Sequence, residues 1–277
     1  MSYKLLAALN MPELNQVIKE MQEASGLLDI PFFAIGALAR NAWYVEHNQP
    51  VRGTRDIDFG VYVPSDRNYN LLREKLIEDF GYTVTVENSF CLISPHGIPV
   101  DLLPFGEIEE QGKILVEGRG MIDLKLDGLS AVFRNGLVRK DIGELSINLS
   151  SIPGVVLLKL IAFDDRPEHR LNDPGDISAI LEHYPYIETD IIWEDYSFLY
   201  ESEKGQLEIG ITALGYELNN IIAEDEMLRQ RVLRILTSAI KEETILAKAM
   251  ILDPERDTIQ SKVMQLRWLK NGLLGLS

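Results

Sequence analysis

The stretch RGTRDIDFGVYV, residues 52–63, constrains the fold of this chain more than any other segment. An extended strand alternates its side chains between two faces, and Asp56 and Asp58 would share one face, with their Cα atoms about 6.5 Å apart. Two carboxylates this close repel each other unless water, a base or a cation lies between them. The segment therefore predicts a strand with a charged site on one face and a core on the other. The core-facing residues are Ile57, Phe59, Val61 and Val63.

A third aspartate occurs in the segment GIPVDLLPF, where Asp101 lies between two apolar residues of a predicted strand. An aspartate buried there without a partner would be unfavourable. If this strand lies beside the one with Asp56 and Asp58, three carboxylates converge at one sheet edge and form an oxygen-rich site for Mg²⁺ or Mn²⁺. The alternative is that Asp56 and Asp58 are turn or edge residues and that Asp101 is a paired surface charge.

A strand, a glycine turn and a helix precede both segments. Residues 31–35 are strand-like, Gly36 supplies the turn, and residues 37–47 predict a helix. The free N–H groups and the dipole of such a helix start favour phosphate binding. A tight turn without a ligand requires the same residues, so Gly36 alone leaves both interpretations open.

Helical patterns flank these strands. Residues 11–26 predict a helix that stops at Gly26, and residues 65–81 predict one with Ser65 or Asp66 as N-cap and Gly81 as its stop. The strand-like segments from 82 to 105 predict an antiparallel meander. Beyond residue 150 the pattern is mostly helical. The predicted class is α/β (α+β), with a small mixed sheet flanked by helices over residues 1–150 and a helical domain over residues 151–277.

Charge and composition narrow the functional classes. The net charge of −16, from 43 acidic and 27 basic residues, argues against broad attraction to nucleic acid. No apolar run reaches the roughly 18 residues of a membrane span, the first residues do not resemble a signal peptide, and Cys91 is the single cysteine. We therefore expect a cytoplasmic protein that is not bound to a membrane.

The C-terminal stretch is basic relative to the rest of the chain. A solvated helix face is favoured there over a nucleic-acid site. The basic residues concerned are Arg229, Arg231, Arg234, Lys241, Lys248, Lys262, Arg267 and Lys270.

The residues Gly36-Ala37, Arg40, Arg52-x-Thr54-x-Asp56-x-Asp58 and Asp101, read in order, resemble the signature of the DNA polymerase β-like nucleotidyltransferase superfamily. The resemblance implies that the glycine turn holds a triphosphate and that three aspartates bind two metal ions, Mg²⁺ or Mn²⁺. The catalytic and metal-binding residues would be Asp56, Asp58 and Asp101, and the nucleotide-binding residues of this part would be Gly36, Ala37, Arg40, Arg52 and Thr54. Ala37 departs from the serine or glycine of many relatives, so a hydroxyl that could contact phosphate is absent.

A second segment, KLIAFDDRPEHRLNDPGDISAIL, resembles a block found in the AbiE-type (AbiEii toxin-like) nucleotidyltransferases, through Lys159, Arg166, Asp173 and Asp176. Lys159 has apolar neighbours at helical spacing, so it either extends to solvent or faces a cleft that holds anions. We assign Lys159 and Asp176 to the nucleotide site. Asp173 and Asp176 equally suit a helix start, with Asp173 as N-cap and proline in the first turn. Asn172 stands where many of these nucleotidyltransferases have a lysine before the aspartate.

The resemblance implies an enzyme of the EC 2.7.7 type that transfers NMP from an NTP to an acceptor hydroxyl and releases pyrophosphate. The acceptor, which could be tRNA, a small molecule or a protein, is expected to bind the helical domain, which would also complete the nucleotide site. A toxin with an antitoxin protein as partner is the finer expectation. The alternatives are an enzyme that modifies an antibiotic or a protein, and a catalytically silent binding module of the same fold.

Overall fold

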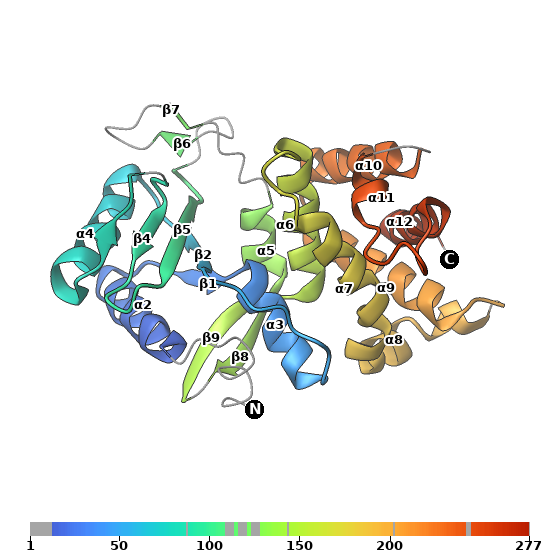
Figure 1. The fold of residues 1–277 in the computed structure, drawn as a ribbon, viewed down its shortest axis with the longest axis horizontal. Helices are drawn as coiled ribbons and strands as arrows, with labels where there is room; N and C mark the ends of the chain where they lie inside the picture. Colours follow the sequence, from blue (N-terminus) through green and yellow to red (C-terminus); the bar gives the residue numbers. More distant parts are fainter. Residues whose placement is uncertain are drawn as a thin grey trace. The chain divides into compact units, whose positions relative to one another are not determined.

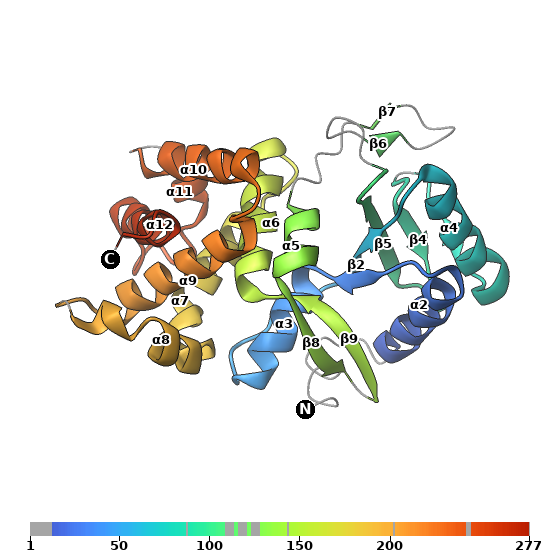
Figure 2. The ribbon, with the colours of Figure 1, turned by 180° about the vertical axis from the view of Figure 1, so that it is seen from behind.

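Figures 1 and 2 show a computed structural model of the chain from opposite sides. The structure describes residues 13–86, 88–108, 114–115, 121–122, 128–142, 144–201, 203–241 and 245–276. The chain divides into two compact units. The sheet unit comprises Met1–Phe133 and Leu137–Ser151, and the helical unit comprises Arg134–Gly136 and Ile152–Ser277.

The sheet unit is built on a seven-stranded mixed sheet in the order β3-β4-β5-β2-β1-β9-β8. Strand β2 is parallel to β5 and antiparallel to β1, and β1 is parallel to β9. Strand β4 is antiparallel to both β3 and β5, as the predicted meander requires. The strands are β1 Phe32–Ala34, β2 Ile57–Tyr62, β3 Thr83–Val84, β4 Cys91–Ile93, β5 Pro99–Phe105, β8 Leu137–Ile142 and β9 Leu145–Ser150. A separate two-stranded sheet pairs β6 Ile114–Leu115 with β7 Met121–Ile122.

The alternation predicted for β2 is present. Its apolar residues Ile57, Phe59 and Val61 are fully buried, and burial of each such side chain contributes roughly 1.5–3 kcal/mol. On the other face, Tyr62 stacks against Phe133, with ring centroids 5.4 Å apart. The aromatic cover thus lies at the far end of β2, and the aspartates lie at its start.

Four helices accompany the sheet: α2 Leu14–Leu28, α3 Gly36–Glu46, α4 Asp66–Phe80 and α5 Leu129–Asn135. Ser65 caps α4 by accepting a hydrogen bond from the Asn68 backbone N–H at 3.3 Å, and Gly81 ends the helix with φ of 73°. Both boundaries were predicted.

The predicted stop of α2 at Gly26 is wrong. The helix continues to Leu28, and Asp29 takes the left-handed conformation with φ of 54°. The buried Ile30 donates its backbone N–H to the Ser25 carbonyl at 3.0 Å, which closes the helix end around Asp29. Aspartate tolerates this conformation better than most residues, so Asp29 can end the helix. Burial of Ile30 thus outweighs the local preference of Gly26 for a helix end.

The helical unit contains the predicted run of helices. They are α6 Ile152–Asp165, α7 Asp173–Ile187, α8 Thr189–Asp195, the 3-10 helix η1 Ser197–Glu201, α9 Gln206–Ile222, α10 Glu226–Ile240, α11 Ile245–Ala249 and α12 Ile259–Leu273. Helices α9 and α12 pack closely because Gly215 and Gly272, which lack a Cβ atom, let the two backbones approach. A Cβ atom on either glycine would clash with the backbone of the other helix. Within the described ranges, no helix combines the length and apolar character needed to cross a membrane.

Candidate functional site

Two of the three predicted carboxylates lie directly opposite each other. Strands β2 and β5 pair in parallel with Asp58 in register with Asp101. Neighbouring strands are about 4.8 Å apart, and register partners in a parallel pair point to the same face of the sheet. Asp58 and Asp101 are half-buried, whereas their neighbours Ile57 and Val100 are fully buried. The register therefore brings two carboxylates together on the face opposite the β2 core residues.

Gly36 adjoins the Asp58 carboxylate. It has φ of +61°, and a Cβ atom built on it would lie 2.5 Å from Asp58 Oδ2. The Ile35 backbone N–H donates to the Asp58 carbonyl at 3.0 Å, which fixes the turn to the strand. Ile35 is the N-cap of α3 in extended conformation and provides no side-chain cap. The start of α3, with its backbone donors and dipole, therefore lies next to a carboxylate, as expected for a site that binds a phosphate with its cation.

Asp56, which was predicted to share a strand face with Asp58, instead lies just before β2 on the exposed loop that leads into the strand. Thr54 Oγ1 donates to Asp56 Oδ1 at 2.6 Å, so a short hydrogen bond orients this carboxylate. The Thr54 hydroxyl, which the sequence assigned to nucleotide binding, therefore already has a hydrogen-bond partner in the same loop.

Arg40, a buried residue of α3, contacts the loop that precedes β2. Only 3% of this residue is exposed, and its Nη2 donates to Asn41 Oδ1 at 2.9 Å. Asn41 Nδ2 in turn donates to the Arg52 carbonyl at 2.9 Å, and Arg40 Nη2 approaches the same oxygen at 3.5 Å. These contacts indicate that Arg40 positions the loop carrying Arg52, whose side chain is exposed. Contact of either arginine with nucleotide stays a prediction.

The structure adds Asn88, which the sequence did not single out. Asn88 Nδ2 donates to both carboxylate oxygens of Asp101, at 3.1 and 3.3 Å. Its own Oδ1 accepts the Phe90 backbone N–H at 3.0 Å, and its backbone N–H donates to Thr85 Oγ1 at 3.3 Å. Asn88 is therefore a fixed amide that orients Asp101. The signal that could have found it is an asparagine in the turn before the strand that pairs with the Asp101 strand.

Cys91 lies in register with Asp101 on the antiparallel strand β4. Burial, reinforced by a hydrogen bond to Asp101, raises the pKa of the Cys91 thiol to about 12. The thiol is therefore protonated at neutral pH and does not compete with the carboxylates as an anionic ligand.

The donor set can be tested against a divalent cation. Among the residues that the structure describes, no three histidine, cysteine, aspartate or glutamate side chains are already gathered as a metal-binding group. Asp58 and Asp101 nevertheless present carboxylates side by side, and Asp56 lies two residues before Asp58. Carboxylate oxygens with neutral amide and hydroxyl neighbours suit Mg²⁺ or Mn²⁺ rather than a soft metal.

Lys159 and Asp176 belong to the helical unit, where Lys159 forms ion pairs with Asp173 and with Asp176. Lys159 Nζ lies 2.7 Å from Asp173 Oδ1 and 2.9 Å from Asp176 Oδ2. The lysine side chain is 12% exposed and the two aspartate side chains are 11% and 7% exposed. Of the two predicted alternatives, extension to solvent or a position facing anions, Lys159 adopts the second. The anions are carboxylates of the chain itself. Contact with nucleotide stays a prediction.

The predicted N-cap of α7 at Asp173 is wrong by one residue. Asn172 occupies the N-cap position without a side-chain cap, and Asp173 is the first helical residue. The Asp173 carboxylate is engaged by Lys159 from α6, so an interhelical ion pair takes the place of a local cap.

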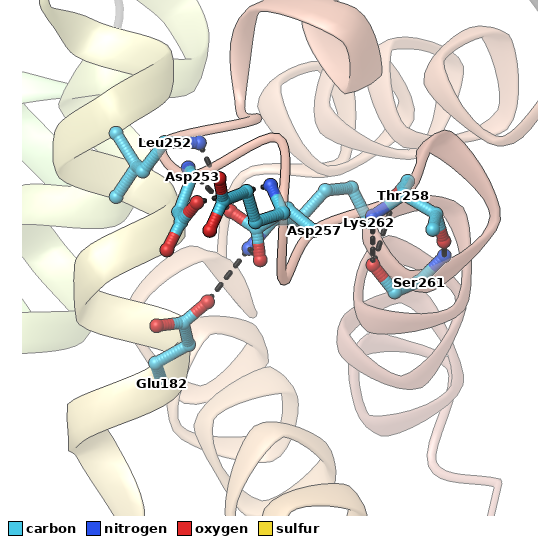
Figure 3. Close-up of polar contacts among 8 residues, drawn as sticks. Glu182, Leu252, Asp253, Asp257, Thr258, Ser261 and Lys262 are labelled. Carbon is cyan, nitrogen blue, oxygen red and sulfur yellow. Dashed lines mark hydrogen bonds and ion pairs between the residues drawn. The ribbon is translucent and has the colours of Figure 1, made fainter.

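Arg231 and Lys262 of the C-terminal stretch are engaged inside the helical unit, which corrects the expected solvated face at these two positions, whereas the Arg234 side chain is 64% exposed, as a solvated face predicts. Arg231 Nη2 lies 2.5 Å from Asp165 Oδ1, and Arg234 Nη2 lies 3.1 Å from Asp164 Oδ2. Lys262 is fully buried and pairs with an acidic side chain on either side (Figure 3).

The Lys262 cluster organises the loop before α12. Lys262 Nζ lies 2.6 Å from Glu182 Oε1 and 2.9 Å from Asp257 Oδ1. The Asp257 carboxylate also accepts the backbone N–H groups of Leu252 at 2.9 Å and Asp253 at 3.2 Å. Burial raises the pKa of Asp257, but the hydrogen bonds from Lys262 and the two backbone N–H groups outweigh it, so the pKa lies below its ordinary value.

No protein-family model matches the chain, and no curated protein sequence is similar to it. An antigenic nucleotidyltransferase-like protein from Paracoccidioides brasiliensis is similar in structure, with 13% identity, a TM-score of 0.43, and coverage of 72% of this chain and 94% of that chain. A Thermotoga maritima CCA-adding enzyme complexed with tRNA has 11% identity, a TM-score of 0.35, and coverage of 94% and 68%. At these identities and TM-scores, the two structures do not define the activity of this chain.

Proposed function

We propose that the chain is a metal-dependent nucleotidyltransferase that transfers NMP from an NTP to an acceptor hydroxyl and releases pyrophosphate. The observation that carries this proposal is the β2–β5 register, which sets Asp58 opposite Asp101 beside the glycine that begins α3. Two adjacent carboxylates next to a helix start provide oxygen ligands for a cation and backbone donors for a phosphate. The order of these residues in the sequence, which resembles a nucleotidyltransferase signature, supports the same assignment.

Asp56, Asp58 and Asp101 would hold two divalent cations, Mg²⁺ or Mn²⁺. When bound, Mg²⁺ would lower the pKa of the acceptor hydroxyl and offset the charge of the triphosphate. The backbone N–H groups of Gly36 and Ala37 would donate to phosphate oxygens, which holds the nucleotide in place. Thr54 keeps the Asp56 carboxylate oriented through its 2.6 Å hydrogen bond.

Asp101 would act as the general base. The acceptor oxygen bonds to the α-phosphorus, the bond from that phosphorus to the leaving oxygen breaks, and the hydroxyl proton passes to an Asp101 carboxylate oxygen. Asn88 would keep that carboxylate oriented through its amide group. Arg52 would offset charge on the departing pyrophosphate, on a loop that Arg40 supports.

The finer assignment, an AbiE-type toxin with an antitoxin partner, rests on the resemblance of residues 159–181. We keep Lys159 and Asp176 as proposed nucleotide contacts and the helical unit as the proposed acceptor-binding part. The Lys159 ion pairs with Asp173 and Asp176 have to open, at least in part, for the lysine to reach a phosphate. A catalytically silent binding module with the same residues is the competing proposal.

Calorimetric titration of an NTP into the protein, with Mg²⁺ and with EDTA, tests the metal-bridged site. We expect binding only with Mg²⁺, because triphosphate and three carboxylates otherwise repel each other. Equal affinity in EDTA would contradict the proposed site. Pyrophosphate release in the presence of candidate acceptors then separates the enzyme from the silent module, which would bind NTP with Mg²⁺ but release none.

A further inference from the structure

Helices α8 and η1 carry exposed aromatic side chains that the proposed nucleotidyltransferase site does not include. Trp193 on α8 is 62% exposed, and Tyr200 on η1 is 40% exposed. The two rings meet edge to face, with centroids 4.9 Å apart. Phe198, 42% exposed, extends the surface and meets the Tyr216 ring at 5.7 Å. We call Trp193, Phe198 and Tyr200, with the carboxylates defined below, the α8–η1 surface.

This surface is anchored from beneath. Ile192 is 2% exposed and Leu199 is fully buried, so each element has a core residue next to its exposed ring. Tyr196, between the two elements, is 7% exposed and donates a hydrogen bond to Glu217 on α9. The exposed rings are therefore presented on a fixed support, and ordering them on binding would require little conformational entropy.

The charge around these rings is of one sign. The sequence has no lysine or arginine between Arg170 and Lys204. Exposed carboxylates precede and follow the ring residues along the chain. Within the described part of the chain, none of these carboxylates forms an ion pair. They are Asp190, Glu194, Asp195, Glu201 and Glu203. Cationic side chains are attracted to aromatic rings through cation–π contacts and to nearby carboxylates through ion pairs.

The sign of this charge selects the occupant. Nucleic acid and anionic lipid would both place phosphates against carboxylates. A second copy carries the same net charge of −16 and would be repelled. We propose that the α8–η1 surface docks a basic polypeptide segment, with an arginine seated on the Trp193 and Tyr200 rings and neighbouring cations paired with the carboxylates. Arginine is favoured because its planar guanidinium stacks on aromatic faces.

Fluorescence anisotropy with the full-length protein tests this proposal, with a labelled peptide that alternates arginine and serine as the probe at physiological ionic strength. We expect Trp193→Ser/Tyr200→Ser, which leaves the charge unchanged, to weaken binding about tenfold or more, as hot-spot aromatics do. Glu194→Gln/Asp195→Asn should weaken it by a smaller factor. Met227→Ser on α10, at a residue 84% exposed, is the matched apolar control, and Glu74→Gln/Glu78→Gln on α4 is the matched charge control.

Each outcome decides the matter. If the aromatic pair variant binds the peptide as the wild type does, or if the α4 control weakens binding as much as Glu194→Gln/Asp195→Asn, attraction is non-specific and the proposal is overturned. Sedimentation of the protein alone addresses the second copy: a dimer that Trp193→Ser/Tyr200→Ser dissociates would also overturn it. Circular dichroism monitors folding. If the serine pair unfolds, Trp193→Leu/Tyr200→Leu, which keeps apolar volume but removes the ring faces, replaces it with the same expectation.

Discussion

Asp58 and Asp101 in the sheet unit can be compared with Asp173 and Asp176 in the helical unit. Both pairs bring two carboxylates to one place. In the helical unit Lys159 completes the group, with its Nζ 2.7 and 2.9 Å from the two carboxylates. In the sheet unit strand register aligns the carboxylates, and a neutral amide from Asn88 orients Asp101. The first group thus includes a lysine of the chain, and the second is the group that we propose to bind a divalent cation.

Substitution in the sheet unit gives the largest expected effect. Under the proposed function, Asp58→Asn or Asp101→Asn should lower NMP transfer by roughly 10²–10⁴-fold, because each removes a proposed metal ligand and the second also removes the proposed base. The melting temperature without metal should stay level or rise, since one of two adjacent like charges is removed. Pyrophosphate release and thermal unfolding measure the two effects, with Glu78→Gln on the exposed face of α4 as control. A large fall in melting temperature would make these aspartates structural and remove the contrast between the units.

The reverse is expected for the lysine of the helical unit. Lys159→Met should destabilise the fold by about 3–5 kcal/mol, because it removes the ammonium group that lies 2.7 and 2.9 Å from two buried carboxylates. Lys75→Met on α4 is the matched control: its 2.6 Å pair with Asp79 is solvent-exposed and should contribute no more than about 1 kcal/mol. Urea unfolding measures both. Adding Asp173→Asn and Asp176→Asn to Lys159→Met should recover part of the loss, and equal stability of the Lys159 and Lys75 variants would contradict the comparison.

Gly36 tests how tightly the sheet-unit site is built. Gly36→Ala should destabilise the fold by about 1–2 kcal/mol through its φ of +61°, and it should displace the Asp58 carboxylate, whose Oδ2 would lie 2.5 Å from the new methyl carbon. Gly26→Ala, within α2 and with no atom within 4 Å of the added Cβ, should instead stabilise by roughly 0.5–1 kcal/mol. Chemical denaturation compares the two. Stabilisation by Gly36→Ala would mean that Asp58 and the α3 turn are not coupled.

The smallest expected effect is the acid dependence of the helical unit. Because the folded pKa of Asp257 lies below its ordinary value of 3.8, its contribution to stability is present above that value and is lost as the pH falls through the folded pKa. Asp257→Asn should therefore show a shallower fall in the free energy of unfolding below pH 3.8 than the wild type. Urea titrations across this range measure the difference, and parallel curves would mean that the Lys262 pair does not stabilise the ionised form.

Local features of the fold could be predicted wherever the signal and its cause lie within a few residues. Ser65 caps α4 because its hydroxyl reaches the Asn68 backbone N–H, and Gly81 ends the same helix because glycine tolerates positive φ. The alternation of β2 fixed which residues face the core, since an extended strand has a period of two. The stop at Gly26 and the cap at Asp173 were wrong because a buried Ile30 and an interhelical lysine outweighed local preference.

The sequence by itself determined that Asp58 and Asp101 lie in strands and that Lys159 lies on an apolar helix. Only the tertiary structure decided which groups meet: Asp58 with Asp101 by strand register, Asn88 with an aspartate 13 residues away, and Lys262 with a glutamate 80 residues away. The physical reason is that side-chain periodicity is set by backbone geometry over a few residues, whereas register and ion pairing depend on how distant elements pack, which no local pattern encodes.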